Sequence, residues 1–84
     1  MRAWFVYLLE CEDGSVYTGI ALDPAARFAA HAAGRGARYT RSRRPVRLLA
    51  AIAFPDRSSA LREEYRIKQL SARDKRLLAL AHAN

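Results

Sequence analysis

The sequence predicts an α+β domain in which three strands and three helices follow one another in the order β-β-α-β-α-α. Two short runs of aromatic and β-branched residues flank an Asp-Gly turn signal, a pattern typical of a β-hairpin. Helix-capping signals stand in front of amphipathic stretches on either side of a third apolar run. The chain has 84 residues, enough for one small core, so we expect a single domain over residues 1–84.

The first predicted strand covers residues 3–9 (AWFVYLL), which are apolar at every position. A strand of this kind is expected to be buried on both faces, as the central strand of a sheet is. Residues 15–20 form the second predicted strand. The Asp13-Gly14 turn signal between the two strands predicts that they pair as a hairpin.

The length of the hairpin loop decides how Tyr7 and Tyr17 lie relative to each other. With a two-residue turn, residue 17 pairs with residue 10, and the two tyrosines face opposite sides of the sheet. With a three-residue loop, residue 17 pairs with residue 9, and both tyrosines share a face. Each tyrosine alone is more often an amphipathic residue at the edge of a core. A site that uses both therefore requires a loop of odd length or a bulge.

Asp23-Pro24 is a strong helix start, with aspartate as the N-cap and proline at the first helical position. The helix is expected to run over AARFAAHAA and to end at Gly34, a residue suited to the C′ position. Residues 34–45 (GRGARYTRSRRP) have no apolar period. We expect them to form a basic loop that contains glycine.

The second half of the chain supplies one strand and two helices. Residues 46–54 (VRLLAAIAF) predict the third strand, and a proline closes it. A helix is expected over about residues 58–70. Ser71 with Asp74 three residues later resembles a capping box, which predicts a last helix that ends near His82.

The charge of the chain indicates a polyanionic partner. Fifteen basic residues against eight acidic ones give a net charge of +7. A coding bias toward GC-rich DNA can explain arginine in place of lysine, but it does not explain this excess. Because phosphate contacts release condensed counterions, an excess of this size favours nucleic acid as the partner.

Cys11 is the only cysteine, so an intrachain disulfide is excluded and a reducing compartment is the natural interpretation. No apolar run approaches the roughly 20 residues that a membrane helix needs. The N-terminus also lacks the pattern of a signal peptide. We therefore expect a cytoplasmic protein with no membrane partner.

Arg27 and His31 are four residues apart on the first predicted helix, so they are expected on one face. An arginine fork suits a scissile phosphate because it can hold two oxygens and keeps its charge. A histidine can accept or pass on a proton near neutral pH. The alternative is an exposed arginine beside a solvated histidine, and the spacing alone does not decide between the two.

Glu64 is spaced by four and three residues from Ala60 and Ile67, which places it on the apolar stripe of its helix. A carboxylate there needs a partner, since burying a bare charge is costly. The structural alternative is an ion pair with Lys68, one turn further on. The functional alternative is a metal ion, because Mg²⁺ is often held by one or two carboxylates with waters and substrate oxygens.

The predicted loop after the first helix combines basic residues with an aromatic one, which suits phosphate binding with base stacking. A flexible solvated loop is the alternative. Together with Lys68, the residues expected to bind nucleic acid are Arg35, Arg38, Tyr39, Arg41, Arg43 and Arg44.

Taken together, these residues resemble the GIY-YIG nuclease family. Phe5-Val6-Tyr7 stands where Gly-Ile-Tyr would be, and Tyr17-Thr18-Gly19 keeps the tyrosine and the glycine of the second motif. Arg27 and His31 match the helix residues of the family, and Glu64 matches its metal-binding glutamate.

The resemblance covers about residues 3–78. The block VYTGI, with RFxxH and ALREEYRIKQL downstream, is similar to small stand-alone bacterial members of the family. It implies a three-stranded antiparallel sheet flanked by helices, with the site on one face of the sheet.

The resemblance also implies chemistry. It implies hydrolysis by a water that is activated through a tyrosine, with one Mg²⁺ (or Mn²⁺) ion on Glu64 and Arg27 stabilising the developing charge. We favour Tyr7 as the base, with Tyr17 orienting water or phosphate, and Tyr39 as a secondary candidate. An ordinary tyrosine has a pKa near 10, so a base role needs help from a cation, the metal or His31.

The chain departs from the family pattern in two ways. Many members carry an asparagine after the metal glutamate, but none lies between Glu64 and Asn84. Lys68 or Gln69 is the conjectured substitute. Members also usually gain specificity from an attached domain, so we expect a protein partner to supply it here.

The expected function is metal-dependent hydrolysis of phosphodiester bonds in DNA, at branches, flaps or ends, in repair or recombination. Two alternatives stay open: an accessory module that binds nucleic acid with little or no turnover, or a nuclease that needs a partner for DNA affinity. The presence of all the matched site residues together favours catalysis, because binding alone does not need that geometry.

Overall fold

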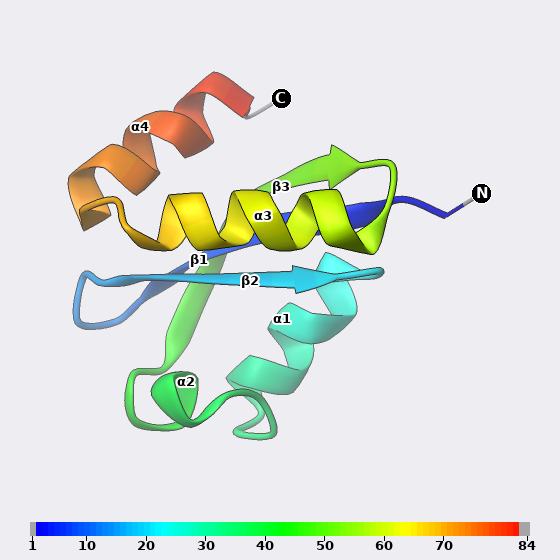
Figure 1. Ribbon diagram of the computed structural model, residues 1–84. Coiled ribbons are helices and arrows are strands. Elements are labelled where there is room, and N and C mark those ends of the chain that lie inside the picture. Colours follow the sequence, from blue (N-terminus) through cyan, green and yellow to red (C-terminus); the bar gives the residue numbers. More distant parts are fainter. Residues whose placement is uncertain (1, 83–84) are drawn as a thin grey trace.

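A three-stranded antiparallel sheet in the order β2-β1-β3 is the middle layer of the structure, a computed structural model that describes residues 2–82 (Figure 1). The strands are β1 (Trp4–Cys11), β2 (Val16–Ala21) and β3 (Pro45–Phe54). β1 is central, and its residues from Val6 to Leu9 are buried, as its unbroken apolar run predicted. The predicted fold class is confirmed, and the predicted order of elements is confirmed with one short helix added.

The hairpin between β1 and β2 has a three-residue loop. Leu9 pairs with Tyr17 and Glu10 with Val16, and the Cys11 amide donates to the Ser15 carbonyl at 2.9 Å, which leaves residues 12–14 as the loop. Gly14 has a φ of 86°, a left-handed conformation that glycine adopts without strain, and its amide bonds the Cys11 carbonyl at 3.0 Å. Of the two loop lengths considered from the sequence, this is the one that puts Tyr7 and Tyr17 on the same face.

Helix α1 (Pro24–Ala32) begins as predicted, with the Asp23 carboxylate accepting a hydrogen bond from the Ala26 amide at 3.1 Å. It ends in a Schellman motif around Gly34, whose φ is 80°. The Gly34 amide bonds the His31 carbonyl, and the Arg35 amide bonds the Ala30 carbonyl at 2.8 Å. This motif turns the chain back toward the helix that it has just left.

The expectation of a plain loop over residues 34–45 is wrong. A one-turn helix, α2 (Arg38–Ser42), lies within it, and Thr40 is only 2% exposed. The segment lacks an apolar period because the buried residue of α2 is a threonine that is held by hydrogen bonds. Such polar anchoring leaves no hydrophobic pattern in the sequence.

Two helices follow β3. Helix α3 (Arg57–Lys68) starts at the N-cap Asp56, whose carboxylate accepts from the Ser59 amide at 2.8 Å. Helix α4 (Ala72–His82) starts after Ser71, whose hydroxyl accepts from the Asp74 amide, in agreement with the predicted capping signal. Among the helices of residues 2–82, none has the length and apolarity that crossing a bilayer requires.

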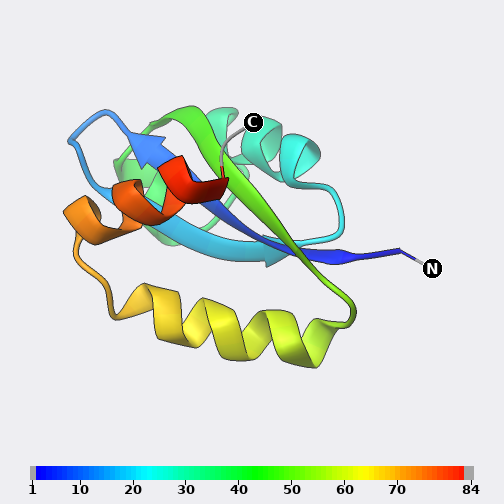
Figure 2. The ribbon, with the colours of Figure 1, turned by 90° about the horizontal axis from the view of Figure 1, so that it is seen from above.

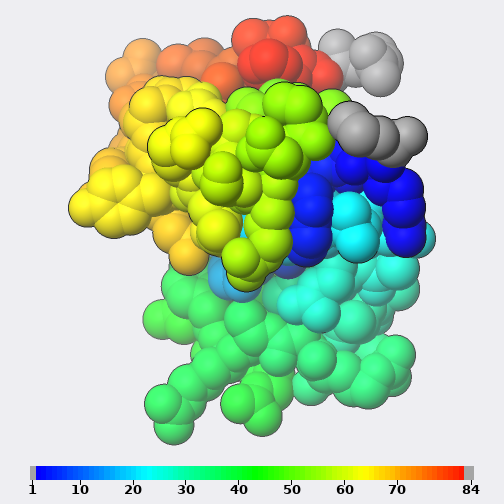
Figure 3. All heavy atoms as spheres, turned by 45° about the vertical axis from the view of Figure 1, so that its right-hand side comes forward, coloured from blue at the N-terminus to red at the C-terminus, as the bar shows by residue number. Residues whose placement is uncertain are grey.

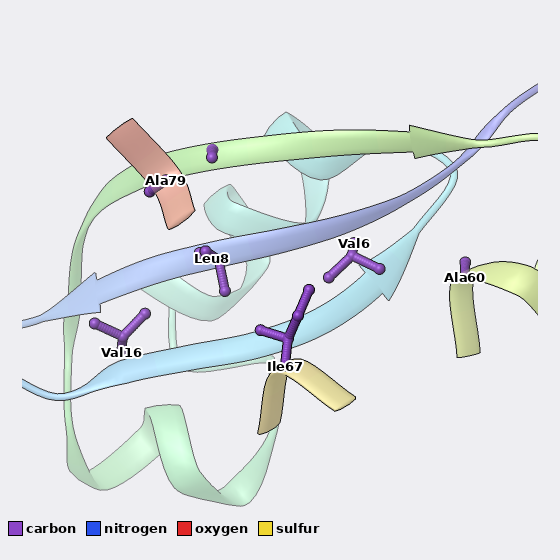
Figure 4. Close-up of a cluster of buried hydrophobic side chains, with 7 residues drawn as sticks. Val6, Leu8, Val16, Ala60, Ile67 and Ala79 are labelled. Atoms are coloured by element: carbon purple, nitrogen blue, oxygen red, sulfur yellow. The ribbon is translucent and has the colours of Figure 1, made fainter. Parts of the chain in front are cut away.

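The sheet has a different core on each face. Seen from above, α3 lies on one side of the sheet and α1 on the other (Figure 2). The α3–α4 side is packed by aliphatic residues, of which Figure 4 labels Val6, Leu8, Val16, Ala60, Ile67 and Ala79. The α1 side is built on Tyr7, Leu9 and Ala21, with Tyr17, Phe28 and Leu48 around them. Of these two cores, the second is therefore the one that contains tyrosines.

Ile67→Ala is expected to lower the free energy of unfolding by about 2–5 kcal/mol, because Ile67 is fully buried in the aliphatic core and truncation leaves a cavity. Leu80→Ala is the matched control, since Leu80 is 73% exposed. Its expected effect is within about 0.5 kcal/mol. Urea unfolding monitored by circular dichroism measures both variants. Equal losses in the two would contradict this description of the core.

Candidate active site

A hydrogen bond between two buried side chains lies at the centre of the candidate site. The Tyr7 hydroxyl is 2.9 Å from Nε2 of His31, and both residues are about 1% exposed. Tyr7 comes from the middle of β1 and His31 from the last turn of α1. The contact joins the sheet to the helix and keeps both side chains in one orientation.

The segment after α1 surrounds the other side of the His31 ring. The Ala37 amide donates to Nδ1 at 3.3 Å, and the Thr40 hydroxyl lies 2.6 Å from the same atom. Gly36 packs so closely on the ring that a Cβ there would collide with it. The residues turned back by the Schellman motif therefore hold the imidazole in position.

The contacts of Nδ1 make opposite demands on the proton of the His31 ring. The Ala37 amide can only donate, which calls for a lone pair on Nδ1. The Thr40 hydroxyl donates its one proton to the Ala37 carbonyl at 2.9 Å, so its contact with Nδ1 calls for a proton there, and Tyr7 then donates to Nε2. Burial, and after it the charge of Arg27, lower the pKa of His31 below its ordinary value, which keeps the ring neutral at neutral pH.

Gly19 explains how the Tyr7 ring reaches across the hairpin. Gly19 pairs with Tyr7 in the sheet, and a Cβ at residue 19 would lie 2.5 Å from the Tyr7 hydroxyl oxygen. The ring therefore lies over the glycine and points toward the edge strand β2. A larger residue at this position would have to displace Tyr7.

Two further rings, those of Tyr17 and Tyr39, continue the cluster. The Tyr17 ring centroid is 6.2 Å from that of Tyr7, 5.1 Å from that of His31 and 5.8 Å from that of Tyr39. The Arg43 guanidinium lies over the Tyr39 ring, 4.4 Å from its centroid. The aromatic cluster thus extends from the buried Tyr7 to the exposed surface of α2.

Arg27 and Glu64 both affect the pKa values of Tyr7 and Tyr17. Burial raises the pKa of Tyr7, the nearby Arg27 opposes this by hydrogen bonding and charge, and Glu64 adds to it. The pKa of Tyr17 is also raised, first by burial and then by Tyr7 and Glu64, while Arg27 lowers it. Residues from β1, β2, α1 and α3 are therefore close enough to influence one another's protonation.

Glu64 forms the ion pair that was the structural alternative considered from the sequence. Its side chain is 16% exposed on the inner side of α3, and a carboxylate oxygen lies 3.5 Å from Nζ of Lys68, so the ion pair is present. The charge of the same carboxylate also raises the pKa of Tyr7 and of Tyr17, after burial, the larger cause. Glu64 therefore lies near both tyrosines while it is paired with Lys68.

The donor set fits one Mg²⁺ or Mn²⁺ ion. Within residues 2–82, no group of three or more His, Cys, Asp and Glu side chains converges, and a structural zinc site needs such a group. Magnesium is commonly held by one or two carboxylates together with waters and substrate phosphate oxygens. Glu64 meets that smaller requirement, while Asn84 lies outside the described residues.

The basic residues expected to bind nucleic acid are all exposed or partly exposed: Arg35, Arg38, Arg41, Arg43 and Arg44. They belong to α2 and the segments on either side of it, next to Tyr39. Arg43 also pairs with Asp13 at 3.2 Å. In Figure 3 this part of the molecule (green) forms the lower half, with α3 and α4 (yellow to red) above it.

Thr40, Gly36 and the Ala37 amide did not emerge from the sequence as parts of the site. The available signal was Gly34, since a glycine at C′ predicts that the chain reverses over the end of its helix. Which side chain the reversed segment meets depends on the tertiary structure, so the contact with His31 could not be predicted.

Comparison with known proteins identifies the family of the chain. A family model for the GIY-YIG catalytic domain matches residues 3–77. A UPF0213 protein of Cupriavidus pinatubonensis is 55% identical over 74 residues, which cover 88% of this chain and 82% of that one. A UPF0213 protein of Halobacterium salinarum is 52% identical over 73 residues, covering 87% of this chain and 95% of the relative.

A solved structure is also similar. The solution NMR structure of a UPF0213 protein from Bacillus halodurans has a TM-score of 0.57 and 49% identity, covering 94% of this chain and 84% of that one. Together with the family model, these likenesses show that the chain belongs to the GIY-YIG family, a nuclease superfamily, and is a relative of the UPF0213 proteins.

Proposed function

We propose that this chain is an endonuclease that hydrolyses phosphodiester bonds in DNA with one Mg²⁺ or Mn²⁺ ion on Glu64. The observation that carries the proposal is the hydrogen bond of 2.9 Å between Tyr7 and His31, with Tyr17, Arg27 and Glu64 around it. A module that only binds nucleic acid has no need of a buried tyrosine–histidine pair next to a carboxylate and a guanidinium.

Tyr7 is proposed as the group that takes the proton from the attacking water. The hydrogen bond with His31 fixes the orientation of the Tyr7 hydroxyl. Arg27 lowers the pKa of Tyr7 and so opposes the burial that raises it. A cation on Glu64 would favour the phenolate further. Tyr17, on the same face, is proposed to orient the water or the phosphate.

Arg27 is proposed to bind the scissile phosphate. Its guanidinium lies on an exposed face of α1 and influences both tyrosines. The negative charge on the phosphate oxygens grows toward the transition state, where a preorganised donor contributes most. Arginine suits this task because it stays charged and offers several donors in one plane.

Glu64 would hold the cation, which when bound polarises the phosphate and lowers the pKa of its water ligand. Lys68, which pairs with Glu64 in this structure, would then be released to bind a phosphate oxygen. The exposed arginines of the α2 region and Tyr39 are proposed to bind the rest of the DNA. Cleavage at branches, flaps or ends, a role in repair, and a protein partner that supplies specificity are parts of the same proposal.

Glu64→Gln is expected to lower metal-dependent cleavage by about 100-fold or more, the scale on which loss of one preorganised electrostatic group acts. The substrates are end-labelled single-stranded, linear duplex, flap and four-way-junction DNA with Mg²⁺ or Mn²⁺. Glu63→Gln is the matched control, because Glu63 pairs with Arg66 on the outer side of the helix. It should cut like the wild type, and binding should persist in both variants.

Unchanged cutting by Glu64→Gln would show that the site is wrongly assigned. A wild-type protein that binds DNA in a salt-sensitive way but cuts none of the four substrates would favour an accessory module or a partner-dependent nuclease.

Replacing Arg41 and Arg44 by alanine is expected to weaken DNA binding and to flatten its salt dependence. Removing one bound phosphate reduces the steepness of log K against log salt by about 0.9 for duplex DNA. The control removes the same charge elsewhere, with Arg62 and Arg73 on α3 and α4 replaced. Fluorescence anisotropy at several salt concentrations measures both. Identical slopes in the two double variants would mean that the α2 region is no special DNA-binding surface.

His31 predicts a pH dependence of stability. Its pKa is lower in the folded state, so the unfolded chain takes up the proton first as the pH falls. The free energy of unfolding should therefore decrease below about pH 6.5, by at most about 1.4 kcal/mol per pH unit for one proton. His31→Gln should remove this slope between pH 7 and 5, whereas His82→Gln, at an exposed position, should keep it. Denaturant unfolding at each pH tests this, and equal slopes in the two variants would contradict it.

A further inference from the structure

A hollow of about 330 Å³ lies next to the tyrosine cluster, at the edge strand β2. Its volume is near the lower end of the range for small-ligand pockets, about 300–1,000 Å³. It has room for one nucleotide of a single nucleic-acid strand rather than for a stacked base pair. The residues that line it come from β2, α2, α3 and α4: Val16, Tyr17, Thr18, Tyr39, Lys68 and Lys75.

The hollow contains both lysines of the chain. Of the fifteen basic residues, only Lys68 and Lys75 are lysines, and both line this one hollow. Lys68 is near enough to lower the pKa of Lys75, after burial, the larger cause. No ion pair within residues 2–82 involves Lys75, whose Nζ instead donates to the Val16 carbonyl at 2.9 Å. Of these two ammonium groups, only Lys68 has a carboxylate partner, Glu64, in the described part of the chain, so the charge of Lys75 is left for an anion.

Aromatic and polar groups complete the lining. Tyr39 is partly exposed at the hollow, and Arg43 covers one face of its ring, which restrains the ring. Thr18 also lines the hollow, and its buried hydroxyl has no hydrogen-bond partner among residues 2–82. Cations beside aromatic rings are what single strands bind, with phosphates on the cations and bases on the rings.

The hollow is connected to the candidate site at two points. Tyr17 belongs to both, since its ring lines the hollow and lies 6.2 Å from that of Tyr7. Lys68 also belongs to both, through its ion pair with Glu64. A strand whose scissile phosphate lay between Arg27 and Glu64 would therefore place its neighbouring nucleotide here.

We propose that this hollow binds one unpaired nucleotide of the substrate strand, with its phosphate on Lys68 and Lys75 and its base against Tyr39. The inference rests on the proposed nuclease function and narrows its substrate class to DNA with a single-stranded segment at the cleavage position. A base inside a duplex cannot pack against Tyr39, because the neighbouring base pairs cover both of its faces.

The test measures binding without metal, so that it does not depend on cleavage. The probes are a fluorescein-labelled oligothymidylate of about 10 nucleotides and a blunt duplex of the same length, in EDTA. Lys75→Met and Tyr39→Leu are each expected to weaken single-strand binding about 5-fold or more, with a smaller effect on the duplex. Arg73→Met is the matched control, because it removes one exposed charge from the same helix as Lys75.

Equal losses of affinity for the two probes, or a weakening by Lys75→Met no greater than by Arg73→Met, would overturn the inference. Absence of single-strand binding by the wild type would overturn it too. Thermal melting checks the fold of Lys75→Met, which cannot bond Val16, and Tyr39→Leu leaves that bond intact. If the variants lose more affinity for the single strand than for the duplex but the wild type never cuts, the nuclease proposal alone is refuted. If the wild type cuts but the variants lose equal affinity for both probes, only the proposed nucleotide site in the hollow is refuted.

Discussion

The register of the β1–β2 hairpin is the constraint on which the rest of the site depends. Because residues 12–14 form a loop of odd length, Tyr17 pairs with Leu9 and shares a face with Tyr7. The same register brings Gly19 opposite Tyr7, where the absence of a side chain lets the tyrosine ring cross the strand. With one residue fewer in the loop, Tyr17 would face the other side of the sheet and Gly19 would no longer lie opposite Tyr7, since side chains alternate along a strand. The aliphatic core on the other face depends on this register as well.

Much of the fold could be predicted from the sequence because its signals are local. The apolar run of β1 indicated a central strand, and Asp23-Pro24 indicated the start of α1. The hairpin register could not be chosen, because an Asp-Gly pair fits both a two-residue turn and the longer loop that is observed. Helix α2 was missed because its buried residue, Thr40, is held by polar contacts that leave no periodic pattern.

For the candidate site, too, the spacing of residues along the chain predicted some features and could not predict others. Spacing placed Arg27 and His31 on one face of α1, yet the arginine is exposed and the histidine is fully buried. A spacing of four residues determines that two side chains point to the same side of a helix. Whether each side chain is buried depends on what packs against it, and for His31 this is the reversed segment after Gly34. Similarly, the apolar stripe predicted that Glu64 points inward. It did not show that Lys68 and the tyrosines would both lie within its reach.

The bond between Lys75 and Val16 also matters for the behaviour of the molecule in concentrated solution. β2 is an outer strand of the sheet, and the Cys11–Ser15 bond implies, by the alternation of an antiparallel ladder, that the Val16 carbonyl faces away from β1. Unpaired groups on such an edge are a template for strands of other molecules, and proteins often protect them with lysine. Nζ of Lys75 donates to that carbonyl from α4, 59 residues further along the chain. The last helix therefore occupies one outward carbonyl at the start of the outer strand, and this carbonyl becomes available to strands of other molecules when α4 detaches.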